Sequence, residues 1–263
     1  MELVVGDIGN TFCKICLVSE TKNKITKIYN LRTKGIKTVK DLQYFFKNKK
    51  FLYKDLLLKK ALFASVVPSV FSLFKIFLKK EFGITSFDIN DNRLKKIIKI
   101  NIKNPRQVGA DRIANASAAN KFYKSNCIII DFGTATTFDV VTKNGLYNGG
   151  IIAPGIELSM KTLHKATAQL PLLKIKKIKK IIGKNTSEAM HSGFFWGYLG
   201  LIKNIIKGIK QETNKNYKLI CTGGLAGLFS KFISSKIVVD KNLTIKGIIE
   251  IYNYNKVNFF KYE

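Results

Sequence analysis

The sequence predicts an α/β protein built from two related halves. Apolar β-branched runs alternate with segments of helical periodicity, which is the pattern of a mixed fold. One turn motif also occurs twice: an apolar run leads into Asp7-Ile-Gly9, and another leads into Asp131-Phe-Gly133. The second motif follows the first by almost half of the 263 residues. This spacing favours a duplicated architecture in which two related domains hold one ligand.

Each copy of the turn has the composition of a site for phosphate or a cation. Gly133 lets the backbone turn sharply and come close to a ligand, because glycine has no Cβ. Thr134 offers a hydroxyl donor, and the amides of such a turn can face an anion. Asp131 supplies the carboxylate oxygens that hard cations prefer. An ordinary hairpin turn explains either copy alone equally well, whereas the spaced pair favours a ligand site.

In the first half, a β-hairpin is expected over residues 2–20 around the Asp7 turn. Further strands are predicted at 25–32, 61–67 and 85–88, and helices at 39–50, 70–82 and 113–123. The polar, basic stretch 87–105 is expected to hold a strand pair with loops. The first domain is predicted to span residues 1–122.

The second domain is predicted to span residues 123–263 and starts with the Asp131 turn. After it we expect a strand edge and loop at 149–155, helices at 157–163, 187–212 and 243–254, and a strand-to-glycine turn at 219–227. The last helix is expected to close this domain. The long helix 187–212 carries Phe194, Phe195, Trp196 and Tyr198, so we expect it to pack on more than its own domain and to form a dimer interface.

The net charge of +29 is unusual for a chain whose hydrophobic fraction is an ordinary 46%. Such a charge attracts nucleic acid, anionic membranes or phosphorylated substrates. However, the lysines are spread along the whole chain, so a compositional bias is favoured over a specific nucleic-acid partner. No apolar run approaches the roughly 20 residues that cross a bilayer, and no secretion signal is visible. We therefore expect a cytoplasmic protein without a membrane partner.

Cys13 and Cys16 have the spacing of redox and zinc sites, yet they fall in a predicted strand. Residues three apart on a strand point to opposite faces, so the two thiols should not converge. Cys127 and Cys221 lie in apolar runs, where cysteine behaves as a small hydrophobe. We therefore expect neither a disulfide nor a metal site from the cysteines.

Gly109-Ala-Asp111-Arg112 places an acid and a base at a predicted helix N-terminus. An aspartate in a first helical turn complements the helix dipole, and from spacing alone this structural role is favoured over catalysis. Other phosphate sites are excluded, because the chain has neither G-x-x-x-x-G-K-[ST] nor the glycine spacing of the dinucleotide fingerprint. Two histidines leave little room for histidine-based catalysis.

Taken together, the motifs resemble the type III pantothenate kinases, members of the acetate kinase, sugar kinase, Hsp70 and actin superfamily. The motifs cover nearly the whole chain in the right order. They are Asp7-Ile-Gly-Asn-Thr11, Ser65-Val-Val-Pro-Ser69, Asn104-Pro105, Val108-Gly-Ala-Asp-Arg112, Asp131-Phe-Gly-Thr-Ala-Thr-Thr137, Gly149-Gly-Ile-Ile-Ala-Pro-Gly155, Thr167 to Pro171, Gly183 to Thr186 and Thr222-Gly-Gly224.

The resemblance implies two ribonuclease-H-like α/β domains of the actin-like ATPase architecture, with ATP in an interdomain cleft. It implies ATP-dependent phosphorylation of pantothenate, the first step towards coenzyme A. The residues carried over as ATP-binding are Asp7, Ile8, Gly9, Asn10, Thr11, Phe12, Cys13, Lys14 and Thr134. Asp7 is placed to hold Mg²⁺ directly or through water, and Asp131 resembles the ligand of a monovalent cation, K⁺ or NH₄⁺.

Gly109, Ala110, Asp111 and Arg112 resemble the residues that hold pantothenate, with Asp111 taking the proton from its primary hydroxyl. With this resemblance, a catalytic role of Asp111 is favoured over the structural role that spacing alone indicated. Since a nearby cation lowers the pKa of a carboxyl group, Arg112 is expected to keep Asp111 ionised near pH 7. Thr186 resembles a substrate-binding threonine supplied across a homodimer interface.

One departure from the family pattern is Ile102, where a tyrosine commonly contacts the substrate. A lost hydroxyl at this place implies weaker pantothenate binding or an altered acceptor. Two alternatives therefore remain open. One is another small-molecule kinase of the same superfamily, and the other is a catalytically degenerate homologue with a regulatory, polyanion-binding role.

Overall fold

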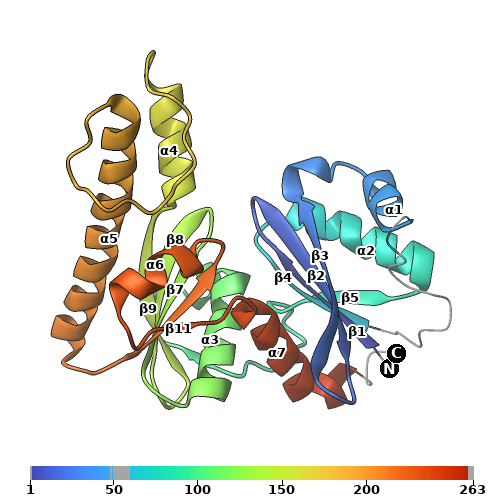
Figure 1. Ribbon diagram of the computed structural model, residues 1–263. Coiled ribbons are helices and arrows are strands. Elements are labelled where there is room, and N and C mark those ends of the chain that lie inside the picture. Colours follow the sequence, from blue (N-terminus) through green and yellow to red (C-terminus); the bar gives the residue numbers. More distant parts are fainter. Residues whose placement is uncertain (1, 48, 50–59, 260–263) are drawn as a thin grey trace. The chain divides into compact units, whose positions relative to one another are not determined.

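Two mixed β-sheets organise the residues that the computed structural model describes, namely 2–47, 49 and 60–259 (Figure 1). Each sheet belongs to its own compact unit. The described residues of the first unit come from Met1–Lys99, Lys103–Phe122 and Leu243–Glu263. The second unit comprises Ile100–Ile102 and Tyr123–Asn242.

The first sheet has the strand order β3-β2-β1-β4-β5. Strand β1 pairs antiparallel with β2, and β2 antiparallel with β3, whereas β1–β4 and β4–β5 are parallel. The bounds of the strands are β1 Glu2–Ile8, β2 Phe12–Ser19, β3 Lys24–Arg32, β4 Lys60–Ser65 and β5 Thr85–Asp88.

The second sheet repeats this plan in the order β11-β10-β7-β8-β9-β6. Strands β7, β8 and β9 are successively antiparallel, and β7–β10 and β10–β11 are parallel. The bounds are β6 Lys99–Ile100, β7 Cys127–Phe132, β8 Ala135–Val141, β9 Leu146–Pro154, β10 Lys218–Gly223 and β11 Val238–Val239. Since β7 to β11 match β1 to β5 in order and direction, the duplicated α/β architecture is confirmed.

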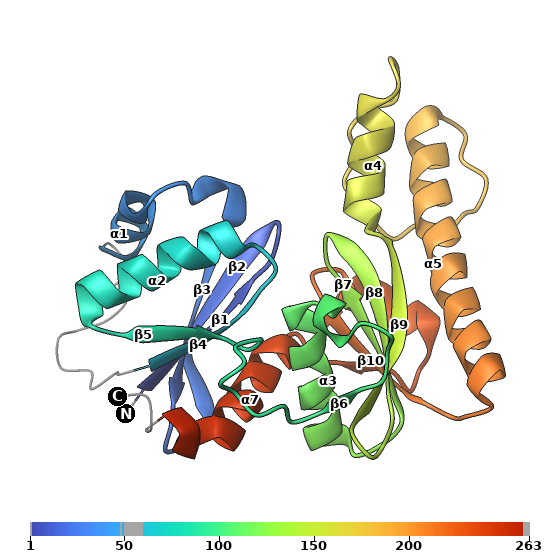
Figure 2. The ribbon, with the colours of Figure 1, turned by 180° about the vertical axis from the view of Figure 1, so that it is seen from behind.

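One face of the first sheet is covered by α1 (Val39–Lys47) and α2 (Pro68–Phe82), as Figure 2 shows. Alternate residues of β1, among them Val4 and Ile8, are buried there with Phe46 and Phe74. Pro68 is the first residue of α2, a position where the missing N–H of proline costs no helical hydrogen bond. The strand β4 ends three residues before this proline.

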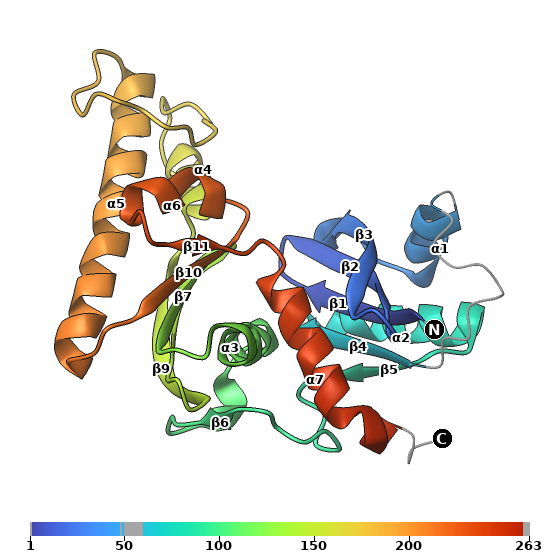
Figure 3. The same ribbon diagram turned by 60° about the horizontal axis from the view of Figure 1, so that its bottom comes forward.

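The other face of the first sheet is covered by α3 (Ala110–Tyr123) and α7 (Leu243–Phe259). Leu3 and Val5 of β1 are buried with Ala114 of α3 and Ile248 of α7. The two helices approach closely: a Cβ on Gly247 would lie 1.8 Å from the carbonyl oxygen of Ala114. Figure 3 shows α7 beside the strands of this sheet.

The position of α7 differs from the sequence expectation. A helix was predicted at 243–254, but as the closing element of the second domain, whereas α7 contacts β1 and β4 of the first sheet. Its hydroxyl-bearing Thr244 also donates a hydrogen bond of 2.9 Å to Asn115 Oδ1 of α3. The first unit is therefore built from both ends of the chain.

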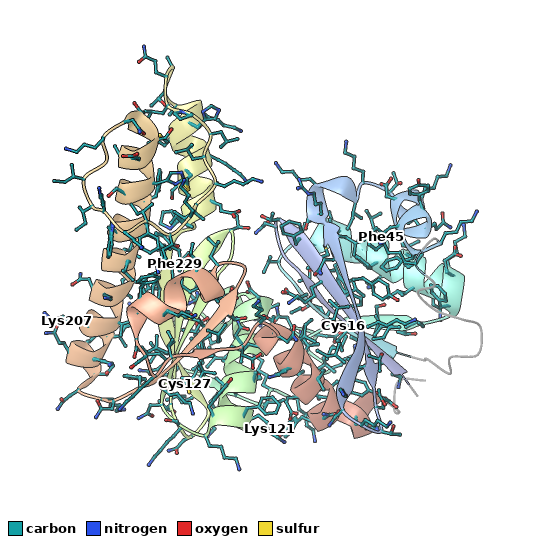
Figure 4. The ribbon with its side chains drawn as sticks, viewed as in Figure 1. Cys16, Phe45, Lys121, Cys127, Lys207 and Phe229 are labelled. Carbon is teal, nitrogen blue, oxygen red and sulfur yellow. The ribbon has the colours of Figure 1, made fainter. Side chains whose placement is uncertain are left out.

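The second unit buries one face of its sheet under α4 (Ile156–Lys165), α5 (Thr186–Thr213) and α6 (Ala226–Ile233). Figure 4 shows Phe229 of α6 among the side chains over this sheet. Its ring stacks on Phe132 and Phe195 with centroids 5.7 and 5.5 Å away, and Tyr198 lies 5.4 Å away. Phe195 and Tyr198 therefore pack inside their own unit. This differs from the expectation that they pack on another domain.

Two further expectations can be compared with the structure. The helix predicted at 39–50 is α1, and residues 48 and 50 lie outside the described part of the chain. The strand pair expected within 87–105 is reduced to the two-residue β6 and a 3₁₀ turn at Pro105–Gln107. Among the described residues, no helix is both long and apolar enough to cross a membrane.

The four described cysteines are all free and buried. Cys13 belongs to the cluster under α1 and α2, and Cys16 to the cluster under α3 and α7, so the two thiols point to opposite faces of β2. Burial raises the pKa of Cys13 to about 11 and that of Cys16 to about 12. Both are therefore unreactive thiols at neutral pH.

Candidate functional site

The first turn motif joins β1 to β2 at the carboxyl end of β1. The N–H of Gly9 donates a hydrogen bond of 3.1 Å to the carbonyl oxygen of Phe12, which closes the turn. Asp7 faces Lys14 across the antiparallel ladder, so an acidic and a basic side chain lie on the same face of the hairpin. Asn10 and Thr11 at its tip are exposed. An exposed turn bordered by these two charges can hold a phosphate chain and its cation.

Strand alternation decides which face Asp7 occupies. Its neighbours Gly6 and Ile8 point towards the other side, and Val5, two residues away, is buried under α3 and α7. Asp7 is also the direct partner of Ala64 in the parallel strand β4. The carboxylate therefore projects from the end of the sheet face that α3 and α7 cover.

Asp111 reaches this same face from the first turn of α3. Ala110, the first residue of the helix, is buried in one cluster with Val5 and Ala64. The carboxylate Oδ1 of Asp111 accepts the backbone N–H of Arg112 at 2.8 Å. Gly109 leaves the room for it, because a Cβ there would lie only 2.6 Å from Asp111 Oδ1. The structure thus brings Asp7 and the Gly109–Arg112 segment to one face of the first sheet.

The expected electrostatics of Asp111 need correction. Burial raises the pKa of its carboxyl group above the usual value of 3.8, and this outweighs the backbone hydrogen bond from Arg112 and its positive charge, which both lower that pKa. Adjacency to Arg112 was visible in the sequence, but the burial was not. A carboxylate with a raised pKa is a stronger base, which suits a group that takes a proton from a hydroxyl.

Asp131 occupies the corresponding place in the second unit. It is the penultimate residue of β7, as Asp7 is of β1, and it pairs with Thr137 of β8 and Thr222 of β10. Ile130 and Phe132 on either side are buried under the helices of this unit, so Asp131 projects from the opposite face. The turn that follows is closed by the Gly133 N–H, which donates to Ala135 O at 3.1 Å.

The backbone of a glycine lies close to this carboxylate. Gly223, at the end of β10, has a φ of +86°, and a Cβ on it would lie 2.6 Å from both Asp131 Oδ1 and the carbonyl oxygen of Phe132. A side chain at this position would displace the carboxylate or this carbonyl, so the close approach of the two strands requires glycine. The Asp131 carboxylate itself is an oxygen donor of the kind that a hard cation prefers.

Thr134 and Thr186 of the second unit are exposed, and Ile102 is half-buried. Thr134 lies in the turn, and its carbonyl oxygen accepts the N–H of Gly155 at 3.2 Å. Thr186 is the first residue of α5, where Asn185 caps the helix by accepting the Glu188 N–H at 2.9 Å. Ile102 lies against Gly149, whose Cβ would be 3.7 Å from its Cγ2.

The predicted site residues therefore divide between the two units. Those in the first unit are Asp7, Ile8, Gly9, Asn10, Thr11, Phe12, Cys13, Lys14, Gly109, Ala110, Asp111 and Arg112, and those in the second are Asp131, Thr134 and Thr186. Two residues beside the first turn were not singled out from the sequence. Gly6, whose Cβ would collide with the Phe63 ring at 2.3 Å, gave only a generic glycine signal, and Thr33 gave none. Gly223 stood in the Thr222-Gly-Gly224 motif, but its closeness to Asp131 was not expected.

A basic cavity lies within the second unit. It has a volume of about 640 Å³ and is lined at the C-terminal end of α5 by Lys203, Lys207, Lys210 and Lys215, with Ile206 and Leu219 among its apolar residues. Figure 4 places Lys207 on the side of α5 turned away from the sheet. None of the predicted catalytic or binding residues lines this cavity.

Comparison with known proteins identifies the family of this chain. The model of a family described as type III pantothenate kinase matches residues 3–208. The type III pantothenate kinase of Pelagibacter ubique is 48% identical over 251 residues, which cover 94% of this chain and 97% of the relative.

Solved structures agree at the level of the fold. A protein of Campylobacter jejuni described as belonging to the Baf family of transcriptional activators has a TM-score of 0.61 at 20% identity, covering 97% of this chain and 99% of its own. The activator of 2-hydroxyisocaproyl-CoA dehydratase from Clostridium difficile, with bound ADPNP, has a TM-score of 0.52 at 11% identity, covering 100% and 97%. The duplicated actin-like fold expected from the sequence is confirmed.

Proposed function

The chain belongs to the type III pantothenate kinase family, and from this premise we propose that it transfers the γ-phosphoryl group of ATP to the primary hydroxyl of pantothenate. The product is 4′-phosphopantothenate, and the reaction is the first step of coenzyme A biosynthesis. The observation that carries this proposal is the similarity to a type III pantothenate kinase over 94% of the chain.

Phosphoryl transfer requires alignment of the reactants and neutralisation of charge more than covalent chemistry by the protein. In our proposal the turn from Asp7 to Lys14 and the exposed Thr134 bind the phosphates of ATP. The amides of the turn and the ammonium group of Lys14 supply the positive potential that the phosphates need. The duplicated position of Asp7 and Asp131 supports this assignment, because each is the penultimate residue of the corresponding strand, β1 or β7.

In the proposal, Asp7 and Asp131 hold two different cations. Asp7, beside the exposed turn, would hold Mg²⁺ directly or through water, and Asp131, beside Gly223, would hold K⁺ or NH₄⁺. When bound, these ions neutralise negative charge on the transferred group. Asp111 is the proposed base: its carboxylate holds the proton that leaves the pantothenate hydroxyl, while Gly109, Ala110 and Arg112 position the substrate.

We also propose a homodimer with Thr186 reaching the pantothenate site of the partner subunit. Support comes from exposed apolar side chains around α4 and the segment that precedes α5: Leu172 is 57% exposed, Ile181 66% and Ile182 74%. Large exposed apolar side chains of this kind are what an interaction surface requires. Phe195 and Tyr198 are buried, so we propose that these exposed residues form the dimer interface in their place.

The two alternatives have less support. Another acceptor is favoured only by Ile102, and a turnover panel of pantothenate against sugars would reveal it. A purely polyanion-binding role is favoured only by the positive charge, now including the lysine-lined cavity. If nucleic acid binds without regard to sequence and no longer binds at physiological salt, the positive charge causes only nonspecific attraction.

Cytoplasmic localisation stays a prediction, in keeping with the free thiols of the described cysteines.

The first prediction concerns Asp111→Asn. We expect turnover with ATP, Mg²⁺, K⁺ and pantothenate to fall at least about a hundredfold, at the low end of general-base effects. Asp41→Asn is the matched control: Asp41 also lies in a first helical turn, where it accepts the N–H groups of Lys37 and Thr38 at 2.9 and 2.8 Å. It should keep its turnover. Near-normal turnover in Asp111→Asn would remove this carboxylate from the mechanism.

The second prediction is a pH dependence. Because the base must be ionised and burial raises the pKa of Asp111, kcat/KM should fall as the pH drops through a value above the usual 3.8. Arg112→Gln removes a charge that lowers this pKa, so the acidic limb should move to higher pH. Arg93→Gln, which instead loses its ion pair with Asp91 at 2.6 Å, should leave the limb in place. A limb that stays put or moves lower in Arg112→Gln would contradict the assignment.

The third prediction concerns the monovalent cation. Replacing K⁺ by Na⁺ at constant ionic strength should depress the turnover of the wild-type protein. Asp131→Asn should abolish this difference between the two salts, because the carboxylate that distinguishes them is gone. Equal rates in both salts for the wild-type protein would count against a cation site at Asp131.

The fourth prediction tests the dimer by mixing two variants. If Thr186 acts in the partner's site, a heterodimer of Asp111→Asn and Thr186→Val contains one site with both residues intact. Mixed and re-equilibrated subunits should then regain about a quarter of wild-type activity, since half of the dimers are mixed and each has one complete site. Activity no higher than the average of the two separate variants, or a mass of one chain, would contradict the proposal.

A further inference from the structure

The carbonyl oxygens of the Gly9–Thr11 turn are held by one residue from outside it. Thr33 lies directly after β3, and its hydroxyl donates a hydrogen bond of 2.7 Å to the carbonyl oxygen of Gly9. The backbone N–H of the same residue donates to the carbonyl oxygen of Thr11 at 3.0 Å. Two of the three residues at the tip of the turn are therefore fixed through Thr33.

Thr33 is itself locked in place. Its side chain is buried, with 6% of its surface exposed, and Cys13 Sγ lies 3.4 Å from its Oγ1. Since the hydroxyl hydrogen is directed at Gly9, the thiol is the donor of this second contact. The register of the β2–β3 ladder, in which Phe12 pairs with Arg32, brings Thr33 beside the turn.

These contacts control the direction in which the turn presents its amides. The C=O and N–H of a trans peptide point in opposite directions. A Gly9 carbonyl bound to Thr33 therefore directs the N–H of Asn10 away from Thr33. Thr33 contacts Cys13, whose side chain lies under α1 and α2, whereas Asp7 projects from the opposite face of the sheet. Thr33 thus contacts the turn from the side of the sheet opposite to Asp7.

We propose that Thr33 is a positioning residue for the phosphates of ATP, which keeps the repelling carbonyl oxygen of Gly9 turned away and the N–H of Asn10 turned towards them. The proposal rests on the function proposed above, because it takes the Asp7–Lys14 turn as the phosphate site. It predicts a defect specific to ATP, since the Gly109–Arg112 segment that would bind pantothenate makes no part of this contact set.

The test compares Thr33→Val with Thr33→Ser. Valine keeps the shape but loses the hydroxyl, so KM for ATP should rise about fivefold or more, because small displacements of positioning groups are costly in phosphoryl transfer. KM for pantothenate should change less than about twofold. Serine keeps the donor and should restore KM for ATP to near the wild-type value.

Thr26 provides the matched control, because its hydroxyl also donates to a backbone carbonyl of this hairpin, Leu17 O at 3.1 Å, away from the turn. Thr26→Val should lose a comparable hydrogen bond and keep both KM values. Should Thr33→Val fail to fold by its melting curve, Thr33→Cys takes its place. Its thiol is a weak donor, so it should give a smaller rise in KM for ATP than valine is expected to give.

Three outcomes would overturn the proposal: an unchanged KM for ATP in the hydroxyl-deficient variant, an equal rise for both substrates, or a serine variant as defective as valine. A wild-type protein without ATP-dependent pantothenate turnover would instead remove the proposed function itself. The two failures are therefore distinguishable in one set of assays.

Discussion

The position of one carboxylate at the end of the first strand of each sheet is the constraint on which the rest of this structure depends. Asp7 and Asp131 are both held between an antiparallel and a parallel neighbour, so neither can shift without disturbing three strands. The helices that cover the opposite face leave each carboxylate on the side away from them. A duplicated fold thus gives two equivalent acidic positions, which local sequence then adapts, with Lys14 facing one carboxylate and Gly223 lying beside the other.

The two turns, the duplication and most of the helices and strands could be predicted, because they depend on local sequence pattern. Apolar runs followed by Asp-x-Gly identified both turns and the duplication, and the periodicity of 187–212 identified α5 to within a residue at each end. Cys13 and Cys16 could be assigned to opposite faces from strand geometry alone. The roles of the individual site residues came from family resemblance, since spacing alone favoured a structural part for Asp111.

What the sequence did not reveal depends on contacts between distant segments. The amphipathic pattern of 243–254 indicates a helix but not which sheet it covers, and α7 belongs to the first. Arg112 is visible beside Asp111, but the burial that raises the pKa of this carboxyl group arises only when α3 packs on the sheet. Thr33 stands in no motif, and its contacts with Gly9 and Thr11 follow from the register of β3 on β2.

The return of the chain to its first sheet has a consequence for synthesis. Leu3, Val5 and Leu62 emerge from the ribosome long before Ile245, Ile248 and Ile249, which cover them. A nascent chain therefore carries an uncovered apolar surface until residue 249 has been made, whereas all segments of the second unit have been made by residue 242. Domains generally fold in order from the N-terminus during synthesis. Because the first unit needs residues that follow the whole second unit, we expect this order to be reversed here. A chain cut before Leu243 would leave one face of the N-terminal sheet uncovered and prone to aggregate.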